Sequence, residues 1–311
     1  MFNNRIKTAS PGGSMKINGV EIEDTFAEAF DIKIARVLIT AYDYDWALIA
    51  ATEATGFGTS IIMSPAEAGV ERRALCEETP DGRPGYYIQI CHMSEKKLEH
   101  QLILRVSQCV LTAPTASVFD GLPDSEKKFD TGNKLRYFGD GYEKPFEVGG
   151  RKTWAIPVMQ GEFIIENDVG YVDGIAGGNF FIMAKCQPSA LASAKAAVQE
   201  ISDADGVITP FPGGIVSSGS KIGANKYKFL KASTNERFSP ALRNVVEGSL
   251  IPDGVNSVYE IVINGISIDA VKEAIRRGIL AATKIPGVIK ITAGNYGGSL
   301  GKHVIYLRDI L

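Results

Sequence analysis

The chain has 311 residues, of which 45% are hydrophobic and 22% are charged, as in an ordinary globular protein. Its 33 Lys and Arg residues against 36 Asp and Glu residues leave a formal net charge of −3, which argues against the basic face that a nucleic-acid-binding protein needs. Four cysteines without a Cys-x-x-Cys pair and three isolated histidines predict reduced thiols and no protein-bound metal. Glycine is the outlier, because 33 of the 311 residues are glycine, which is above its usual share of ~7%.

The start of the chain differs from the rest. Residues 1–14 are polar and lack the apolar core of a signal peptide, so we expect a polar N-terminal extension ahead of the N-terminal lobe. No stretch approaches the roughly 18 consecutive apolar residues of a membrane span. These features predict a protein without a membrane association.

After Met15 a strand–helix–strand unit recurs four times. Its helices are predicted from apolar residues on one face, such as Leu98, Leu102 and Val106. Asp45 is expected to cap the start of the first helix and Gly56 to follow its end. The first strands of the four units are expected at residues 35–40, 86–90, 179–183 and 258–263, and the second strands at residues 59–63, 110–112, 206–209 and 288–291.

Four such units in two pairs predict an α/β (α+β) protein with two lobes. Each lobe is expected to be a ferredoxin-like split β-α-β unit, an antiparallel sheet with helices on one face. A doubly wound parallel sheet is the alternative, and it is disfavoured because no unit carries a Gly-x-Gly-x-x-Gly turn. We expect the lobes to span residues 15–150 and 151–311, with a junction near Gly150 and most of the glycine-rich loops in the second lobe.

The segment 209–231 is the densest in residues that bind anions. Its glycine spacing is similar to that of a phosphate-binding loop, but Ser220 separates Gly219 from Lys221, so the motif is incomplete. Free backbone amides, serines and lysines could hold an anionic substrate tail. A solvated loop with structural glycines is the alternative. The candidate residues here are Gly213, Gly214, Ser217, Ser218, Lys221, Asn225 and Lys226.

Glu260 is a carboxylate in an otherwise apolar predicted strand. It either points to solvent by alternation or is partly buried with a raised pKa, which would make it a proton donor or acceptor near neutral pH.

Two further glycine clusters, at residues 174–179 and 293–298, lie at the ends of predicted strands and could let the backbone approach a planar ligand. The first adds Gly177, Gly178 and Asn179 as candidate binding residues. Arg83 lies in a Pro- and Gly-rich stretch that is typical of tight turns.

Several stretches together resemble the formylmethanofuran:tetrahydromethanopterin formyltransferase family, and the similarity runs from Met15 to the C-terminus. They include Asn18-Gly-Val-Glu-Ile-Glu-Asp-Thr-Phe-Ala-Glu-Ala-Phe30, Glu78-Thr-Pro-Asp-Gly-Arg-Pro-Gly85, Gly174-Ile-Ala-Gly-Gly-Asn-Phe-Phe181, Ile208-Thr-Pro-Phe-Pro-Gly-Gly-Ile-Val216, Gly223-Ala-Asn-Lys-Tyr-Lys-Phe-Leu-Lys231, Val258-Tyr-Glu-Ile-Val-Ile-Asn-Gly265 and Ala293-Gly-Asn-Tyr-Gly-Gly298.

The resemblance implies a cytoplasmic archaeal homotetramer, built as a dimer of dimers, that moves a formyl group between methanofuran and N5 of tetrahydromethanopterin. This reaction belongs to the one-carbon metabolism of methanogenesis or its reversal. Methanofuran and tetrahydromethanopterin are then coenzyme substrates, and no prosthetic group is required. Two alternatives remain open: the formyltransferase subunit of a bacterial formyltransferase/hydrolase complex, and a non-catalytic pterin-binding scaffold of the same fold.

The resemblance also implies roles for individual residues. The family's catalytic glutamate matches Glu260, which would act as an acid and base through a tetrahedral intermediate. Charge places the lysines of residues 221–231 at the anionic tails of the two coenzymes. The expected substrate-binding set is Arg83, Gly177, Gly178, Asn179, Gly213, Gly214, Ser217, Ser218, Lys221, Asn225 and Lys226.

Overall fold

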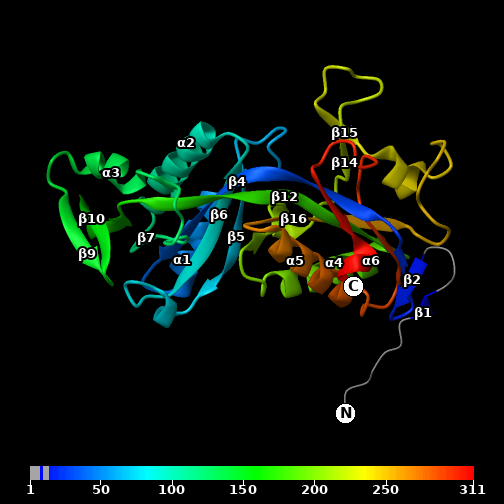
Figure 1. Cartoon of the computed structure of the whole chain (residues 1–311), viewed down its shortest axis with the longest axis horizontal. Helices are drawn as coiled ribbons and strands as arrows, with labels where there is room; N and C mark the ends of the chain where they lie inside the picture. Colours follow the sequence, from blue (N-terminus) through cyan, green and yellow to red (C-terminus); the bar gives the residue numbers. More distant parts are fainter. Residues whose placement is uncertain (1–7, 10–13) are drawn as a thin grey trace, which may run out of the picture.

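The computed structural model describes residues 8–9 and 14–311. Most of the expected extension, residues 1–14, lies outside these residues, but Thr8, Ala9 and Ser14 belong to strands of the sheet. The molecule is elongated, and two long antiparallel strands follow its long axis (Figure 1). These are β4 (Phe26–Thr40) and β12 (Val169–Ala184), which pair from Tyr171 opposite Ala35 to Ala176 opposite Phe30. They belong to one large, mostly antiparallel sheet, so a mixed α/β fold is confirmed and the parallel alternative is wrong.

The first half of the chain builds an antiparallel sheet around the second part of β4. Its strand order is β5-β6-β4-β7. The two longer helices of this half, α1 and α2, pack on the face of the sheet that carries Ala35, Val37 and Ile39. A β11-β10-β9 extension joins this sheet through one parallel contact between β11 and β7. The elements are α1 (Tyr44–Thr55), β5 (Glu67–Ala74), β6 (Gly85–His92), α2 (Glu95–Arg105), β7 (Ser117–Asp120), β8 (Lys128–Phe129), α3 (Thr131–Leu135), β9 (Lys144–Val148), β10 (Arg151–Val158) and β11 (Gly161–Glu166).

Two strands predicted in this half are misplaced. Residues 59–63 form turns, in which Ser60 and Glu67 accept hydrogen bonds from the backbone of Ser64 and Ile61, and the strand follows as β5. Residues 110–112 follow a π-helical turn at Val106–Val110, and β7 begins only at Ser117. The start of α1 also differs from the prediction, because Asp43 rather than Asp45 accepts the Trp46 amide. Gly56 follows the end of the helix as predicted, although the positive φ belongs to the next residue, Phe57.

The second half builds a similar arrangement around the second part of β12. The strand order is β13-β16-β12-β17, and α4 and α5 pack on one face against Phe180, Ile182, Ile261 and Ile263. The β2-β3 hairpin adds to β17, and β18 adds to the first part of β4. The elements are β1 (Thr8–Ala9), β2 (Ser14–Ile17), β3 (Val20–Glu23), α4 (Gln187–Ile201), β13 (Val207–Ile208), β16 (Ser257–Gly265), α5 (Ile268–Ala282), β17 (Val288–Thr292), β18 (His303–Tyr306) and α6 (Leu307–Ile310).

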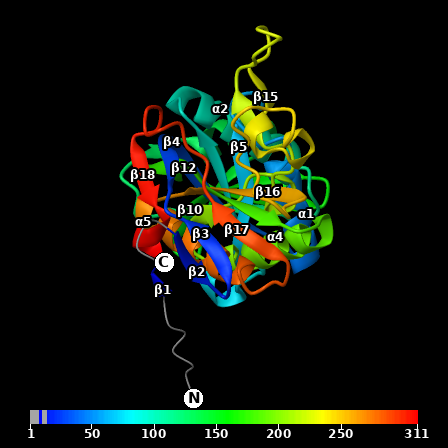
Figure 2. The same cartoon turned by 90° about the vertical axis from the view of Figure 1, so that its right-hand side faces the viewer.

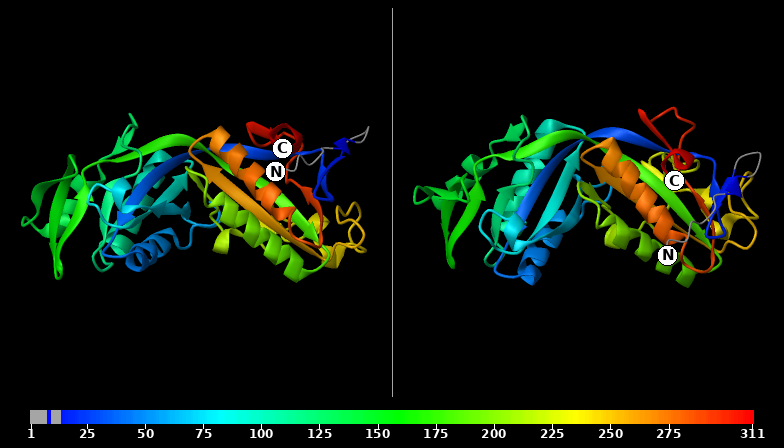
Figure 3. Two further views of the ribbon diagram at one scale, coloured as in Figure 1. Left: turned by 90° about the horizontal axis from the view of Figure 1, so that it is seen from below. Right: turned by 60° about the horizontal axis from the view of Figure 1, so that its bottom comes forward.

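Loops cover the other face of the second sheet. The hairpin of β14 (Ser220–Ile222) and β15 (Ala232–Thr234) projects from the body, and the loop after β17 lies beside it (Figures 1 and 2). Helices α4 and α5 lie on the opposite side of the sheet, in front of it when the molecule is seen from below (Figure 3). Short 3-10 turns at Pro212–Gly214, Glu236–Phe238 and Pro240–Leu242 shape the covering segment.

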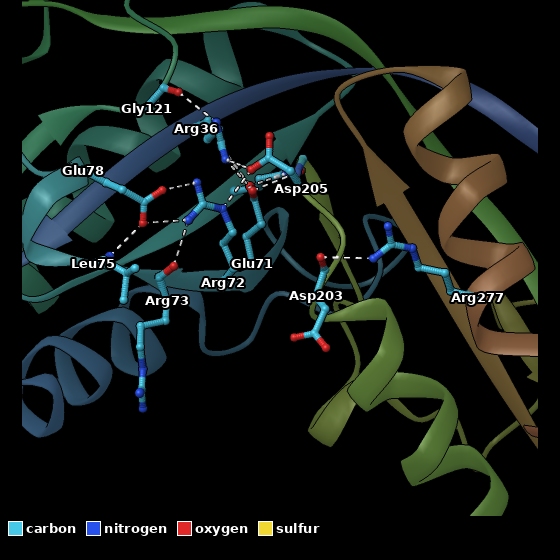
Figure 4. Close-up of polar contacts among 12 residues, drawn as sticks. Arg36, Glu71, Arg72, Arg73, Leu75, Glu78, Gly121, Asp203, Asp205 and Arg277 are labelled. Atoms are coloured by element: carbon cyan, nitrogen blue, oxygen red, sulfur yellow. Dashed lines mark hydrogen bonds and ion pairs between the residues drawn. The ribbon is translucent and has the colours of Figure 1, made fainter. Parts of the chain in front are cut away.

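An ion-pair network built around the buried Arg36–Glu71 pair joins the two halves (Figure 4). Arg36 on β4 binds both carboxylate oxygens of Glu71 on β5, at 2.9 and 2.6 Å, and also binds Asp205, which follows α4. Glu71 in turn accepts the backbone amide of Gly206 at 2.8 Å. Gly150, near which the sequence predicts the lobe junction, lies in the two-residue turn of the β9-β10 hairpin.

Candidate functional site

Glu260 lies on the loop-covered face of the second sheet. Strand alternation turns Ile261 and Ile263 toward the helices, so Glu260 points the other way. It is nevertheless half-buried, and this desolvation raises its pKa from 4.5 to about 7. The alternation argument therefore predicts the direction of the side chain correctly, while the covering loops make its environment apolar.

Two neighbours define the surroundings of Glu260. Phe181 is directly opposite it on β12, and Phe181 is almost fully buried. Val216 exchanges two backbone hydrogen bonds with Glu260, of 2.8 and 3.0 Å. This bridge fastens the glycine- and serine-rich segment that begins at Pro212 to the strand of the carboxylate.

The loop between β17 and β18 lies beside the same face. Gly294 donates its amide to Oδ1 of Asn179 at 2.6 Å, and its carbonyl accepts Nδ2 of Asn179 at 3.1 Å. Tyr296 follows, and its side chain is 43% exposed. Burial raises the pKa of Tyr296, the negative charges of Glu260 and Glu28 raise it further, and a backbone hydrogen bond from Ile222 opposes them. The phenol therefore stays protonated at neutral pH.

Some of the predicted binding residues line one cavity of about 680 Å³. Gly213, Ser217 and Ser218 contribute to it from the segment tied to Glu260, and Lys195 contributes from α4. Thr59 reaches the same cavity from the first half of the chain. The cavity thus lies where the two halves meet, and it combines hydroxyl groups with one exposed ammonium group.

The predicted glycines fall into two kinds. A Cβ on Gly178 would lie 2.4 Å from Val271 on α5, and one on Gly214 would lie 2.6 Å from Thr209. Both glycines therefore allow close packing inside the fold. Gly213 has no atom near its Cβ position, and Gly177, with φ +84°, donates its amide to the buried Asn264.

One of the lysines of the β14-β15 hairpin is paired with a carboxylate of the same chain. Lys221 binds Glu236 at 2.5 Å, and Asn225 binds the same carboxylate oxygen at 3.0 Å. The hydrogen bond from Lys221 is the main reason why the pKa of Glu236 is lowered. Lys226 lies over the ring of Tyr227 and remains exposed, as do Lys228 and Lys231.

Arg83 is not part of this arrangement. Its guanidinium binds Asp81 at 2.8 Å, the carbonyl of Thr115 at 2.7 Å and the hydroxyl of Ser117 at 2.7 Å. It lines a different cavity of about 430 Å³, which is formed by the first-half sheet and its extension. Within the described part of the chain, no group of three or more His, Cys, Asp and Glu residues could hold a metal ion.

Three residues of this face were not singled out as site residues from the sequence. Phe181 and Tyr296 lie inside motifs that drew attention for their glycines, and Glu28 lies in the acidic segment near the start. The motif at residues 293–298 could have pointed to Tyr296. No local sequence pattern could have pointed to the role of Glu28, because its hydrogen-bond partners are backbone amides about 270 positions later in the chain.

A half-buried carboxyl under glycine-rich loops, with a pKa of about 7, is a candidate proton-transfer site of an α/β enzyme. Comparison with known proteins then identifies the family. The family model described as formylmethanofuran-tetrahydromethanopterin formyltransferase matches residues 15–158, and the model of the proximal lobe matches residues 161–310. The chain belongs to this formyltransferase family, which confirms the resemblance seen in the sequence.

Individual relatives agree over nearly the whole chain. The formylmethanofuran–tetrahydromethanopterin formyltransferase of Archaeoglobus fulgidus is 75% identical over 95% of this chain and 100% of its own length. The solved structure of the Methanosarcina barkeri enzyme is 59% identical, with a TM-score of 0.94 over 96% of this chain and all of that chain. The formyltransferase/hydrolase complex of Methylorubrum extorquens, solved with methylofuran, contains a chain that is 42% identical, with a TM-score of 0.90 over 96% of this chain and 98% of that one.

Proposed function

We propose that this protein transfers a formyl group between formylmethanofuran and N5 of tetrahydromethanopterin, with Glu260 as acid and base. The single observation that carries the role of Glu260 is its half-buried carboxyl, whose pKa of about 7 suits proton transfer in both directions near neutral pH. Family membership supports the two coenzymes as substrates.

The chemistry follows from the groups involved. N5 of the pterin attacks the formamide carbon, a C–N bond forms, and negative charge develops on the formyl oxygen. Glu260 takes the proton from N5 and returns it to the amine of methanofuran as the old C–N bond breaks. Covering loops that keep water from the carboxylate also protect the formyl donor from hydrolysis, while alignment of the two large substrates lowers the barrier.

The remaining binding residues divide by position. Gly177 and Asn179 on β12 and Gly213, Ser217 and Ser218 beside Val216 are proposed to approach the coenzyme rings and tails near Glu260. Gly178 and Gly214 would act indirectly, by setting the backbone. Lys226 is proposed to attract anionic tails, with Lys221 and Asn225 holding the hairpin through Glu236. Arg83 stays a proposed binding residue at a separate position, where its guanidinium binds Asp81, Thr115 and Ser117.

Exchange of Glu260 for glutamine tests the catalytic role. Glu260→Gln keeps the shape of the side chain but cannot exchange a proton, so kcat should fall by about 10²–10⁴-fold. The assay follows formyl transfer spectrophotometrically with formylmethanofuran and tetrahydromethanopterin. Glu147→Gln, an exposed glutamate on β9, is the matched control. Equal turnover of the Glu260 variant and the control would refute the proposed role.

The likeness to the Methylorubrum complex favours one second candidate, a formyltransferase subunit that works with a hydrolase. Purified chain alone separates the candidates. Full transfer activity without other subunits supports the free enzyme, and activity that depends on added partners supports the complex. No transfer in either case would leave a pterin-binding scaffold.

We further infer two ferredoxin-like lobes. The orders β5-β6-β4-β7 and β13-β16-β12-β17, each antiparallel with two helices on one face, support this topology. The two hydrophobic cores divide the chain in space, with residues 35–171 around one core and residues 20–29 and 175–307 around the other. The proposed boundary near Gly150 is close to the point where the two family models meet along the chain, between residues 158 and 161. It does not coincide with the division of the residues between the two hydrophobic cores.

A homotetramer in the cytoplasm completes the proposal. Its support is the family resemblance, and a mass measurement in solution tests the assembly. Among the described residues no helix is both long and apolar enough to cross a membrane.

A further inference from the structure

A carboxylate outside the proposed acid–base step organises the loop between β17 and β18. Glu28 lies on β4 with only 2% of its surface exposed. Its Oε2 accepts the backbone amides of Tyr296 at 2.6 Å and Gly298 at 3.2 Å. Its Oε1 accepts those of Leu300 and Gly301, both at 2.5 Å. One side chain thus fixes four backbone amides of a six-residue stretch.

The same loop is fastened at its start to the face that carries Glu260. Asn179 holds Gly294 through two hydrogen bonds, and a Cβ on Gly294 would lie 2.8 Å from the ring of Phe181. Phe181 is the direct cross-strand neighbour of Glu260. Asn295 binds the Phe26 carbonyl at 3.0 Å, which ties the loop to β4 as well. Tyr296 is therefore held between two anchored points next to the catalytic carboxylate.

We propose that Glu28 is a positioning residue that holds the loop so that the Tyr296 hydroxyl can donate a hydrogen bond to the formyl oxygen as it becomes negative. This role rests on the proposed formyl transfer. Tyr296 forms no covalent bond and gives up no proton in the step. Glu260 moves the proton between the two nitrogens, while the phenol stabilises the charge on oxygen. The partial exposure of Tyr296 leaves its ring accessible to a substrate.

The four backbone amides around Glu28 explain why a carboxylate is needed at this position. Four N–H donors converge on Glu28, and a carboxylate offers acceptors on both oxygens. The four amides outweigh the desolvation of the buried group and keep its pKa below the usual range. Glutamine has the same shape, but its NH₂ group would face two of the four amide donors. Glu28→Gln should therefore release one end of the loop without opening a cavity.

A double-mutant cycle tests the proposal. Tyr296→Phe removes only the hydroxyl, and kcat should fall by about 10²-fold with the KM of both coenzymes nearly unchanged. Glu28→Gln should lower kcat by up to about 10²-fold through misplacement of the ring. The double variant should be no slower than the slower single variant, because both changes remove one interaction. A role of Glu28 in stability alone would lower the melting temperature and leave the kcat of the folded enzyme unchanged.

Controls separate this inference from the proposed function. Asp31→Asn removes another β4 carboxylate, which binds Lys302 and His303 beyond the loop, and it should leave kcat unchanged. If Glu260→Gln is inactive while Tyr296→Phe retains wild-type kcat, the inference is overturned and the proposed function stands. Multiplicative losses in the double variant would equally overturn the link between Glu28 and Tyr296. If Glu28→Gln fails to fold, Tyr296→Phe alone still decides the role of the hydroxyl.

Discussion

Phe181 and Phe238 stack face to face, with ring centroids 4.5 Å apart and planes only 6° from parallel. Phe181 is the residue opposite Glu260, whereas Phe238 comes from the segment that covers the sheet. The stacked pair therefore joins the covering segment to the strand next to Glu260. We attribute the desolvation of Glu260 in part to this contact.

Phe238→Ala should let water reach Glu260. Desolvation is what raises the pKa of this carboxyl to about 7, so the variant should shift it back toward 4.5, by roughly one pH unit. The pH profile of kcat reports the shift, and formyl loss to water should rise in the same variant. Phe138→Ala, an exposed aromatic residue in the first half, is the control. A profile identical to that of the wild type would show that other groups exclude the water.

The raised pKa of Glu260 also has a cost in stability. An unperturbed glutamate ionises near pH 4.5, whereas Glu260 in the folded protein ionises near pH 7. Between these values the folded state binds more protons than the unfolded state, so the contribution of this group to stability falls as the pH rises.

Glu260→Gln should consequently be more stable than the wild type at pH 8, by up to about 3 kcal/mol, and similar to it below pH 4.5. Denaturant unfolding of both proteins across this range measures the difference, in which the other titrating groups cancel. A difference that does not change with pH would contradict the buried state of the carboxyl.

The helices and the order of the units could be predicted from the sequence, because one-sided apolar spacing survives in any context. The two long strands could not. The predicted strands began at Ala35 and Asn179, whereas β4 begins at Phe26 and β12 at Val169. Glycines at positions 174, 177 and 178 and charges such as Glu28 weaken the local strand pattern. Pairing between the strands, which is not local, extends them.

The candidate site, too, could be predicted from the sequence only in part. Glu260 could be assigned only through the family resemblance, because its burial depends on covering loops whose position the pattern of the strand does not predict. Arg83 and Glu28 show the other difficulty. One is held by a turn in the first half, and the other binds amides near the end of the chain, so sequence spacing predicts neither environment.

Alanine at the closely packed glycines should reduce stability first. Gly178→Ala places a methyl group 2.4 Å from Val271, and Gly214→Ala places one 2.6 Å from Thr209 at a φ of +77°. Each change should cost about 1–3 kcal/mol of unfolding free energy. Gly56→Ala, at φ −58° with its nearest neighbour 3.4 Å away, is the matched control. If the packed variants melt like the control and only KM rises, these glycines contact coenzyme instead.

Removal of one partner from the Arg36–Glu71 pair should destabilise the protein strongly. The Glu71 side chain is fully buried, and it accepts Arg36, Gln89 and the amide of Gly206. Arg36→Met leaves this carboxylate buried without its main partner, at a cost of about 3–5 kcal/mol. Asp173→Asn, which disrupts exposed ion pairs with Lys33 and Lys127, should cost less than about 1 kcal/mol. If both variants lower the free energy of unfolding equally in thermal or denaturant unfolding, the Arg36–Glu71 pair does not contribute the predicted stability at the junction between the halves.

The exposed lysines of the β14-β15 hairpin should act on coenzyme binding through long-range charge. Lys226, Lys228 and Lys231 form no ion pair with a carboxylate in the described part of the chain, in contrast to Lys221. Their combined replacement by alanine should raise the KM of both coenzymes several-fold at low salt and leave kcat unchanged. Screening should remove the difference near 1 M salt, where the Debye length is about 3 Å. Lys144→Ala on β9 is the control, and a KM increase that persists in high salt would mean direct contact rather than steering.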